Sequence, residues 1–244
     1  MLKMGGLQGR DADSPNRLDV IAQRSLKTAV VNLVTGGNLL MGVTSIILAS
    51  FGHGRWAVFC LIAGMILDAF DGLLARRWQV FSKIGAELDS LADLTSFVVA
   101  NAVLLFFWFH GRIDLPYQII AGAIFTLCGA FRLARFNVEP TSGGLFQGMP
   151  TTGVALLIAA IYLTHPHLDP VQGLAWQAVL GLLMVSSYPY PKFGTLRRVP
   201  TGYLAALGLF AIWNLPMATA LGCLAYVASG PLLALRQGSA TPGV

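Results

Sequence analysis

Charged residues are scarce in this sequence. Asp, Glu, Lys and Arg together make up 11% of the chain, whereas hydrophobic residues make up 55%. In soluble domains about a quarter of all residues are charged, so this composition excludes an ordinary soluble protein. Cysteine is scarce as well: three cysteines, scattered in apolar segments, do not form a disulfide framework. We therefore expect an all-α helical bundle that spans a membrane.

Long apolar runs predict about eight transmembrane helices of roughly 20 residues each. They cover residues 31–50, 56–76, 84–109, 117–136, 150–164, 172–188, 201–214 and 216–235. The fifth and seventh runs are short for a full span and could instead be buried or re-entrant helices. We expect residues 1–27 to be a cytoplasmic segment, 28–236 the membrane domain and 237–244 a flexible tail. Residues 14–30 suit either an interfacial helix or a solvated leader, because their apolar face is modest.

The basic residues predict the orientation of these helices. If the chain crosses the membrane eight times, every Lys and Arg except Arg55 and Arg112 falls on one side. Because cytoplasmic connections are enriched in Lys and Arg, we place that side and both termini in the cytoplasm. The net charge of +5 then reflects contact with anionic lipid headgroups and requires no nucleic-acid partner.

Four aspartates interrupt this apolar sequence between residues 68 and 93. Asp68 and Asp71 are three residues apart, and Asp89 and Asp93 are four residues apart. Each spacing places its two side chains on one face of a helix, so two facing helices would bring all four together. Since a carboxylate at membrane depth is costly, such a group indicates a functional site.

The residue types in this segment favour a divalent metal and a phosphorylated substrate. Carboxylates so close together repel one another unless a cation compensates them. Oxygen ligands favour Mg²⁺ or Mn²⁺, with Ca²⁺ as a further candidate, and the absence of His and Cys between residues 68 and 93 argues against zinc. Gly72 permits close backbone approach of a ligand, and Arg76 offers a planar donor fork for phosphate.

The full pattern, D-x-x-D-G-x-x-A-R-x8-G-x-x-x-D-x-x-x-D, resembles the motif of the CDP-alcohol phosphotransferase family, membrane enzymes that make phospholipids from CDP-activated lipids. The resemblance implies that a metal is held by Asp68, Asp71 and Asp89, with Asp93 sharing it. It also implies that Asp93 is the general base. The implied CDP pocket contains Asn32, Thr35, Asp68, Gly72, Ala75, Arg76 and Gly85.

Three further segments resemble the phosphatidylserine synthase branch of that family: residues 91–97, 131–137 and 146–150. This resemblance implies transfer of a phosphatidyl group from CDP-diacylglycerol to L-serine, with release of CMP. It implies that Arg132, Arg135 and Asn137 hold the serine carboxylate or a phosphate. The family also suggests a homodimer in the plasma membrane, with its active site at the cytoplasmic side.

Two alternatives remain open at the level of sequence. Related branches use glycerol phosphate, inositol phosphate or choline as the acceptor. A cation or proton transporter is the alternative from another class, because intramembrane carboxylates also build ion pathways. A transporter does not require Gly72, Arg76 and Gly85 at these intervals, and its site would more often lie near the membrane midplane.

Overall fold

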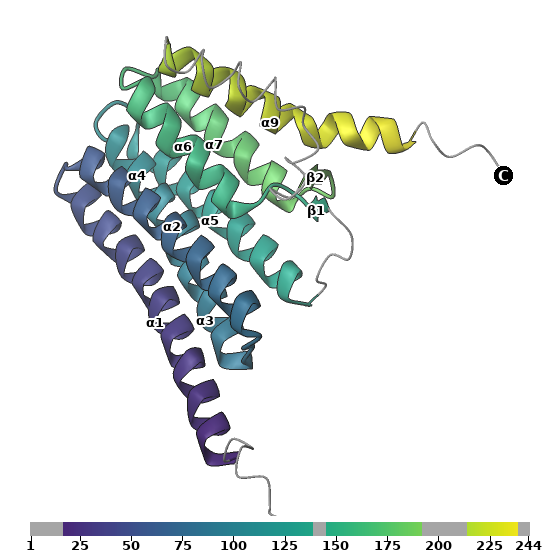
Figure 1. The fold of residues 1–244 in the computed structure, drawn as a ribbon. Coiled ribbons are helices and arrows are strands. Elements are labelled where there is room, and N and C mark those ends of the chain that lie inside the picture. Colours follow the sequence, from purple (N-terminus) through teal and green to yellow (C-terminus); the bar gives the residue numbers. More distant parts are fainter. Residues whose placement is uncertain (1–16, 139–144, 192–213, 239–244) are drawn as a thin grey trace, which may run out of the picture.

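The computed structural model describes residues 17–138, 145–191 and 214–238, and these are mostly helical. The helices are α1 (Arg17–Ser50), α2 (Gly54–Trp78), α3 (Lys83–Asp93), the π-helix η1 (Leu94–Val99), α4 (Ala100–Trp108), α5 (Leu115–Val138), α6 (Thr151–Thr164), α7 (Pro170–Val185) and α9 (Leu215–Gly238). Helices α3, η1 and α4 follow one another without a break. Figure 1 shows α1 to α7 side by side, with α9 lying against α6.

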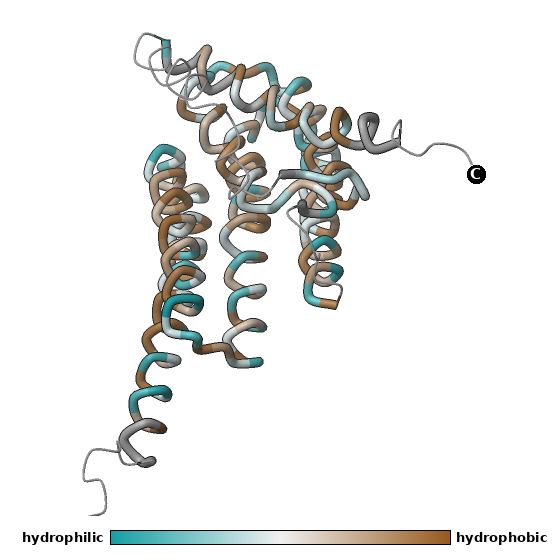
Figure 2. Tube along the Cα trace, turned by 45° about the vertical axis from the view of Figure 1, so that its right-hand side comes forward, coloured by the Kyte–Doolittle hydropathy of each residue, from teal (hydrophilic) through white to brown (hydrophobic). Residues whose placement is uncertain are grey.

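The expected all-α membrane fold is confirmed in its main features. Four helical stretches are long and apolar enough to cross a membrane: Ile21–Ser50, Gly54–Trp78, Lys83–Trp108 and Leu115–Val138. Hydrophobic residues dominate along the helices, as Figure 2 shows. The chain is therefore an integral membrane protein.

The number of eight crossings stays a prediction. Helices α6 and α7 and residues Leu224–Leu233 of α9 are apolar but shorter than the four long stretches. The expected seventh span, residues 201–214, lies outside the described residues except for Asn214.

Helix α1 supports the two helices that carry the aspartates. Both α2 and α3 pack against it, while its first turns project beyond the bundle (Figure 1). Residues 17–30, part of the segment considered as an interfacial helix, are continuous with the first span. The side chains from Ile21 to Lys27 are exposed in the described structure.

The turn between α2 and α3 reverses the chain within a few residues. Helix α2 ends where Gln79 adopts a left-handed conformation with a φ of 54°. Helix α3 begins at a capping serine, because the Ser82 hydroxyl oxygen accepts a hydrogen bond of 2.9 Å from the Gly85 N–H. The turn therefore brings the beginning of α3 back alongside the end of α2.

A short antiparallel pair of strands, β1 (Leu145–Gln147) and β2 (Pro189–Pro191), departs from the all-α expectation. Prolines 189 and 191 cannot continue a helix, and each forces the residue before it into an extended conformation. Beside the pair, Gly148 has a φ of +73°, and a Cβ there would lie 2.8 Å from the Ser186 carbonyl oxygen. This compact corner ties the chain after α5 to the chain after α7.

Candidate active site

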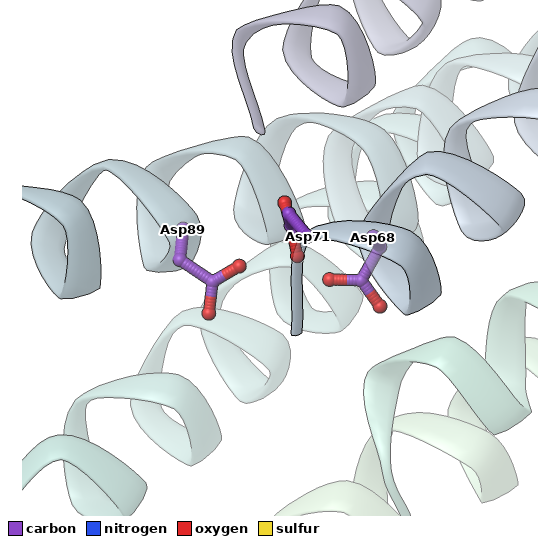
Figure 3. Close-up of side chains that lie close together, drawn as sticks. All are labelled: Asp68, Asp71 and Asp89. Carbon is purple, nitrogen blue, oxygen red and sulfur yellow. The ribbon is translucent and has the colours of Figure 1, made fainter. Parts of the chain in front are cut away.

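Three of the four aspartates converge as their spacing predicts. Carboxylate oxygens of Asp68, Asp71 and Asp89 all lie within 4.8 Å of one another. Figure 3 shows the side chains of Asp68 and Asp71 on one helix and that of Asp89 facing them from another. The motif therefore forms one group across α2 and α3.

This group fits a divalent cation. The Asp71 side chain is buried, with 4% of its surface exposed, and its Oδ2 has no hydrogen-bond partner among the described residues. Three carboxylates in apolar surroundings require compensating charge, and their oxygen atoms are the ligands that Mg²⁺ and Mn²⁺ prefer. Asp68, Asp71 and Asp89 are the residues that would hold the ion. The identity of the ion stays a prediction.

Asp93 lies next to this group without belonging to it. It is one helical turn beyond Asp89, and its carboxyl lies within hydrogen-bonding reach of Asp68. Its Oδ1 is buried and has no hydrogen-bond partner among the described residues. Arg132 of α5 interacts electrostatically with the same carboxyl. Asp93 therefore connects the group of three aspartates with a buried cation.

A pocket of about 240 Å³ opens beside Asp71 and Asp89. Its walls come from α1, α2, α3 and the turn between α2 and α3. Six of the seven residues expected to bind CDP line it: Asn32, Thr35, Gly72, Ala75, Arg76 and Gly85. Asp68, the seventh, lies in the aspartate group but not in the lining of this pocket.

Glycines shape two walls of this pocket. A Cβ at Gly85 would lie 2.8 Å from Ser82 Oγ and 3.0 Å from Asn32 Oδ1, so glycine lets α3 approach α1 closely. A Cβ at Gly72 would lie 3.2 Å from a terminal nitrogen of Arg76. The missing side chain at Gly72 thus leaves room for the guanidinium beside the aspartates.

Several pocket residues escaped the sequence analysis: Thr28, Val31, Val80, Phe81, Ser82 and Ala86. Most have no signature of their own, because α1 and the interhelical turn bring them to the site only through packing. Ser82 did carry a signal, since a serine just before a helical stretch is a typical N-cap.

The three α5 residues expected at an acceptor site have different surroundings. Arg132 is buried, with 6% exposed, and its Nη1 donates a hydrogen bond of 3.1 Å to Thr151 Oγ1. Asn137 exchanges hydrogen bonds with Ser90 and so links the end of α5 to α3. Of the three, Arg132 interacts with Asp93.

The Arg135 guanidinium is hydrogen-bonded to backbone carbonyl groups instead. Its guanidinium donates hydrogen bonds of 3.1 Å to the carbonyl oxygens of Gln147, Val185 and Ser186. These carbonyls belong to β1 and to the segment at the end of α7. Arg135 therefore fastens the corner around the strand pair.

The sequence of this chain is similar to those of known proteins. The model of the CDP-alcohol phosphatidyltransferase family matches residues 28–190. The CDP-diacylglycerol–serine O-phosphatidyltransferase of Helicobacter pylori is 35% identical over 173 residues, which cover 66% of this chain and 71% of that protein. The protein of the same name from Methanocaldococcus jannaschii is 34% identical over 210 residues, which cover 85% and 94%. The archaetidylserine synthase of Methanothermobacter thermautotrophicus is 33% identical over 167 residues, which cover 67% and 70%. With its converging aspartates and the family match over most of its length, the chain belongs to the CDP-alcohol phosphatidyltransferase family.

Proposed function

We propose that this protein is a CDP-diacylglycerol–serine O-phosphatidyltransferase. It transfers the phosphatidyl group of CDP-diacylglycerol to L-serine, giving phosphatidylserine and CMP. The observation that carries this proposal is the convergence of Asp68, Asp71 and Asp89 beside a pocket lined by the family motif. The names of the relatives above support serine as the acceptor.

The nucleotide occupies the pocket between α1, α2 and α3. Arg76 pairs with the phosphates through its donor fork, while Asn32 and Thr35 bind from α1. Because Gly72 and Gly85 have no side chains, the pocket has room for a bulky ligand. A divalent cation bound by the three aspartates would neutralise the pyrophosphate and the departing CMP.

Asp93 acts as the general base. The serine hydroxyl oxygen attacks the phosphorus that carries diacylglycerol, and the bond from this phosphorus to the oxygen of CMP breaks. The hydroxyl proton passes to the Asp93 carboxylate, which stands beside the aspartate group and away from the lining of the nucleotide pocket. Arg132 is the nearby cation for the acceptor, since Arg135 is bound to backbone carbonyls.

The direct test is product identification with purified full-length protein. CDP-diacylglycerol and Mg²⁺ or Mn²⁺ are supplied with L-serine, glycerol phosphate, inositol phosphate or choline in separate reactions, and the lipids are identified by mass spectrometry. We expect phosphatidylserine, with one CMP released per lipid formed. A product with another alcohol would overturn the serine assignment. Absence of any lipid product, together with cation flux in proteoliposomes, would favour a transporter.

Orientation, location and assembly are part of the proposal. We place the active site at the cytoplasmic side of the plasma membrane because the connection between α2 and α3 at the pocket carries Arg76, Arg77 and Lys83, and cytoplasmic connections are enriched in Lys and Arg. We expect a homodimer from the family. A reporter fused after Gln79 should then read cytoplasmic, and one fused after His167 should read external. An external signal after Gln79 would contradict the cytoplasmic placement.

A further inference from the structure

Arg132 lies in a buried polar cluster next to Asp93. Neither Arg132 nor Asp93 lines that pocket. The buried guanidinium of Arg132 interacts electrostatically with Asp93 and Tyr226, and it donates a hydrogen bond to Thr151. A buried charge is stable only when such partners surround it. The four residues come from α3, α5, α6 and α9, so the cluster depends on how these helices pack.

Helix α9 brings Tyr226 to this cluster through close packing on α6. A Cβ at Gly153 of α6 would lie 3.0 Å from Cε1 of Tyr226 and 3.5 Å from its hydroxyl. Tyr190 of β2 secures α9, because its hydroxyl donates a hydrogen bond of 3.2 Å to the Val227 carbonyl oxygen. The family model matches residues 28–190, so Tyr226 lies beyond the matched segment.

The chemistry of serine suits this cluster. Its hydroxyl and carboxylate are carried by adjacent carbon atoms, so a base at the hydroxyl leaves the carboxylate close by. A guanidinium next to Asp93 is therefore placed for the carboxylate, to which it can donate two parallel hydrogen bonds. For the Arg132 guanidinium to present two parallel donors, other groups must fix its orientation. Thr151 accepts a hydrogen bond from this guanidinium, and Tyr226 interacts with it electrostatically.

We infer that Tyr226 is a positioning residue, which fixes the Arg132 guanidinium that the proposed function assigns to the acceptor. Tyr226 thereby contributes to acceptor selectivity, whereas the motif on α2 and α3 performs the transfer. This inference rests on the proposed function, because it takes a serine-like acceptor as given.

The test compares L-serine with L-serinamide, which keeps the hydroxyl and the ammonium group but replaces the carboxylate with a neutral amide. KM and kcat are measured for both acceptors at saturating CDP-diacylglycerol, in full-length Arg132→Gln and Tyr226→Phe proteins. We expect KM for L-serine to rise about 10- to 100-fold in Arg132→Gln and about 3- to 10-fold in Tyr226→Phe. KM for serinamide and the affinity for CMP should change by less than about twofold, because neither involves the carboxylate.

Tyr190→Phe is the matched control, since it removes a hydroxyl from the neighbouring ring of the same aromatic pair. The two ring centroids are 5.8 Å apart. Burial raises the pKa of Tyr190 to about 12, so its hydroxyl stays protonated and donates to the Val227 carbonyl oxygen throughout ordinary assay conditions. This variant should lower thermal stability but leave the ratio of kcat/KM for serine and serinamide unchanged.

The outcomes separate the inference from the function on which it rests. If the wild type makes phosphatidylserine but Tyr226→Phe behaves like Tyr190→Phe, Tyr226 only packs and the inference fails. A rise in KM for CDP-diacylglycerol in Arg132→Gln, without a rise for serine, would show that Arg132 binds a phosphate and would also overturn it. A wild type that makes no phosphatidylserine would overturn both. Tyr226→Phe keeps the ring, so the test remains decisive even if Arg132→Gln fails to fold.

Discussion

The two sides of the aspartate group present their cations in different ways. On the nucleotide side, Arg76 is exposed beside a pocket of about 240 Å³. On the other side, Arg132 is 6% exposed and is enclosed by groups from several helices. An open wall suits a large nucleotide that carries a lipid, whereas an enclosed cation suits a small acceptor. The difference suggests that affinity for the nucleotide and choice of the alcohol can be altered separately.

Removing the metal should have the largest effect, because the aspartate group serves both sides. Excess EDTA should abolish phosphatidylserine formation, and Mg²⁺ or Mn²⁺ added back should restore it. Asp71→Asn should likewise lose activity and bind CMP weakly, since it removes a buried ligand charge beside the pocket. Both are measured by release of CMP and by binding of labelled CMP. Full turnover in excess chelator would sink the assignment of these aspartates as metal ligands.

Asp93→Asn should separate the two sides. The change keeps the size of the side chain but removes its basicity, so kcat should fall about 10²- to 10⁴-fold. Binding of CDP-diacylglycerol should persist, because Asp93 does not line the nucleotide pocket. Rate and binding are measured separately on the same preparation. Near-normal turnover would remove Asp93 as the base.

Gly85→Ala should impair the nucleotide side alone. The added methyl group would press on Ser82 Oγ and Asn32 Oδ1, so we expect CMP affinity to fall on the order of 10-fold, as for a strained close contact of 1–2 kcal/mol. KM for serine should stay unchanged. Gly36→Ala on α1 is the matched control, because nothing lies within 4 Å of a Cβ there. Equal effects of the two substitutions on CMP binding would contradict the role given to Gly85.

Arg135→Gln should have the smallest kinetic effect. Its guanidinium donates to three backbone carbonyls, so its loss should lower the free energy of unfolding by about 1–3 kcal/mol. KM for serine should change less than twofold, in contrast to Arg132→Gln. Thermal denaturation in detergent and acceptor kinetics provide the two measurements. A large rise in KM for serine would place Arg135 at the acceptor after all.

The convergence of Asp68, Asp71 and Asp89 could be predicted because the spacing of the aspartates is local in sequence. A fixed spacing on two consecutive helices determines which side chains share a face, and the third span, expected at 84–109, is observed at Lys83–Trp108. On the acceptor side, the spacing of residues in the sequence does not predict which side chains meet. Arg132 and Arg135 are three residues apart on one helix, yet one reaches Asp93 and the other reaches backbone carbonyls.

That separation depends on tertiary neighbours. Periodicity predicts the face of α5 on which both arginines lie, but not whether α6 or the corner near β1 covers each of them. Tyr226 carried no signal either, because an aromatic residue in an apolar run is ordinary. The strand pair was missed for a similar reason: two three-residue strands joined across a long stretch of chain leave no hydropathy pattern.

Because of the π-helix Leu94–Val99, the direction in which Asp89 and Asp93 face depends on the number of residues in this span and not only on its hydrophobic composition. Within it, the Ala100 N–H bonds to the Thr95 carbonyl, five residues back instead of four. Each residue of an α-helix turns the chain by about 100°, so the additional residue sets the rotational phase of Asp89 and Asp93 against that of the buried α4 residues. A one-residue deletion here would leave the span just as apolar, yet it would rotate one half relative to the other by about 100°. The chain would still cross the membrane, but its carboxylates would no longer face Asp68 and Asp71.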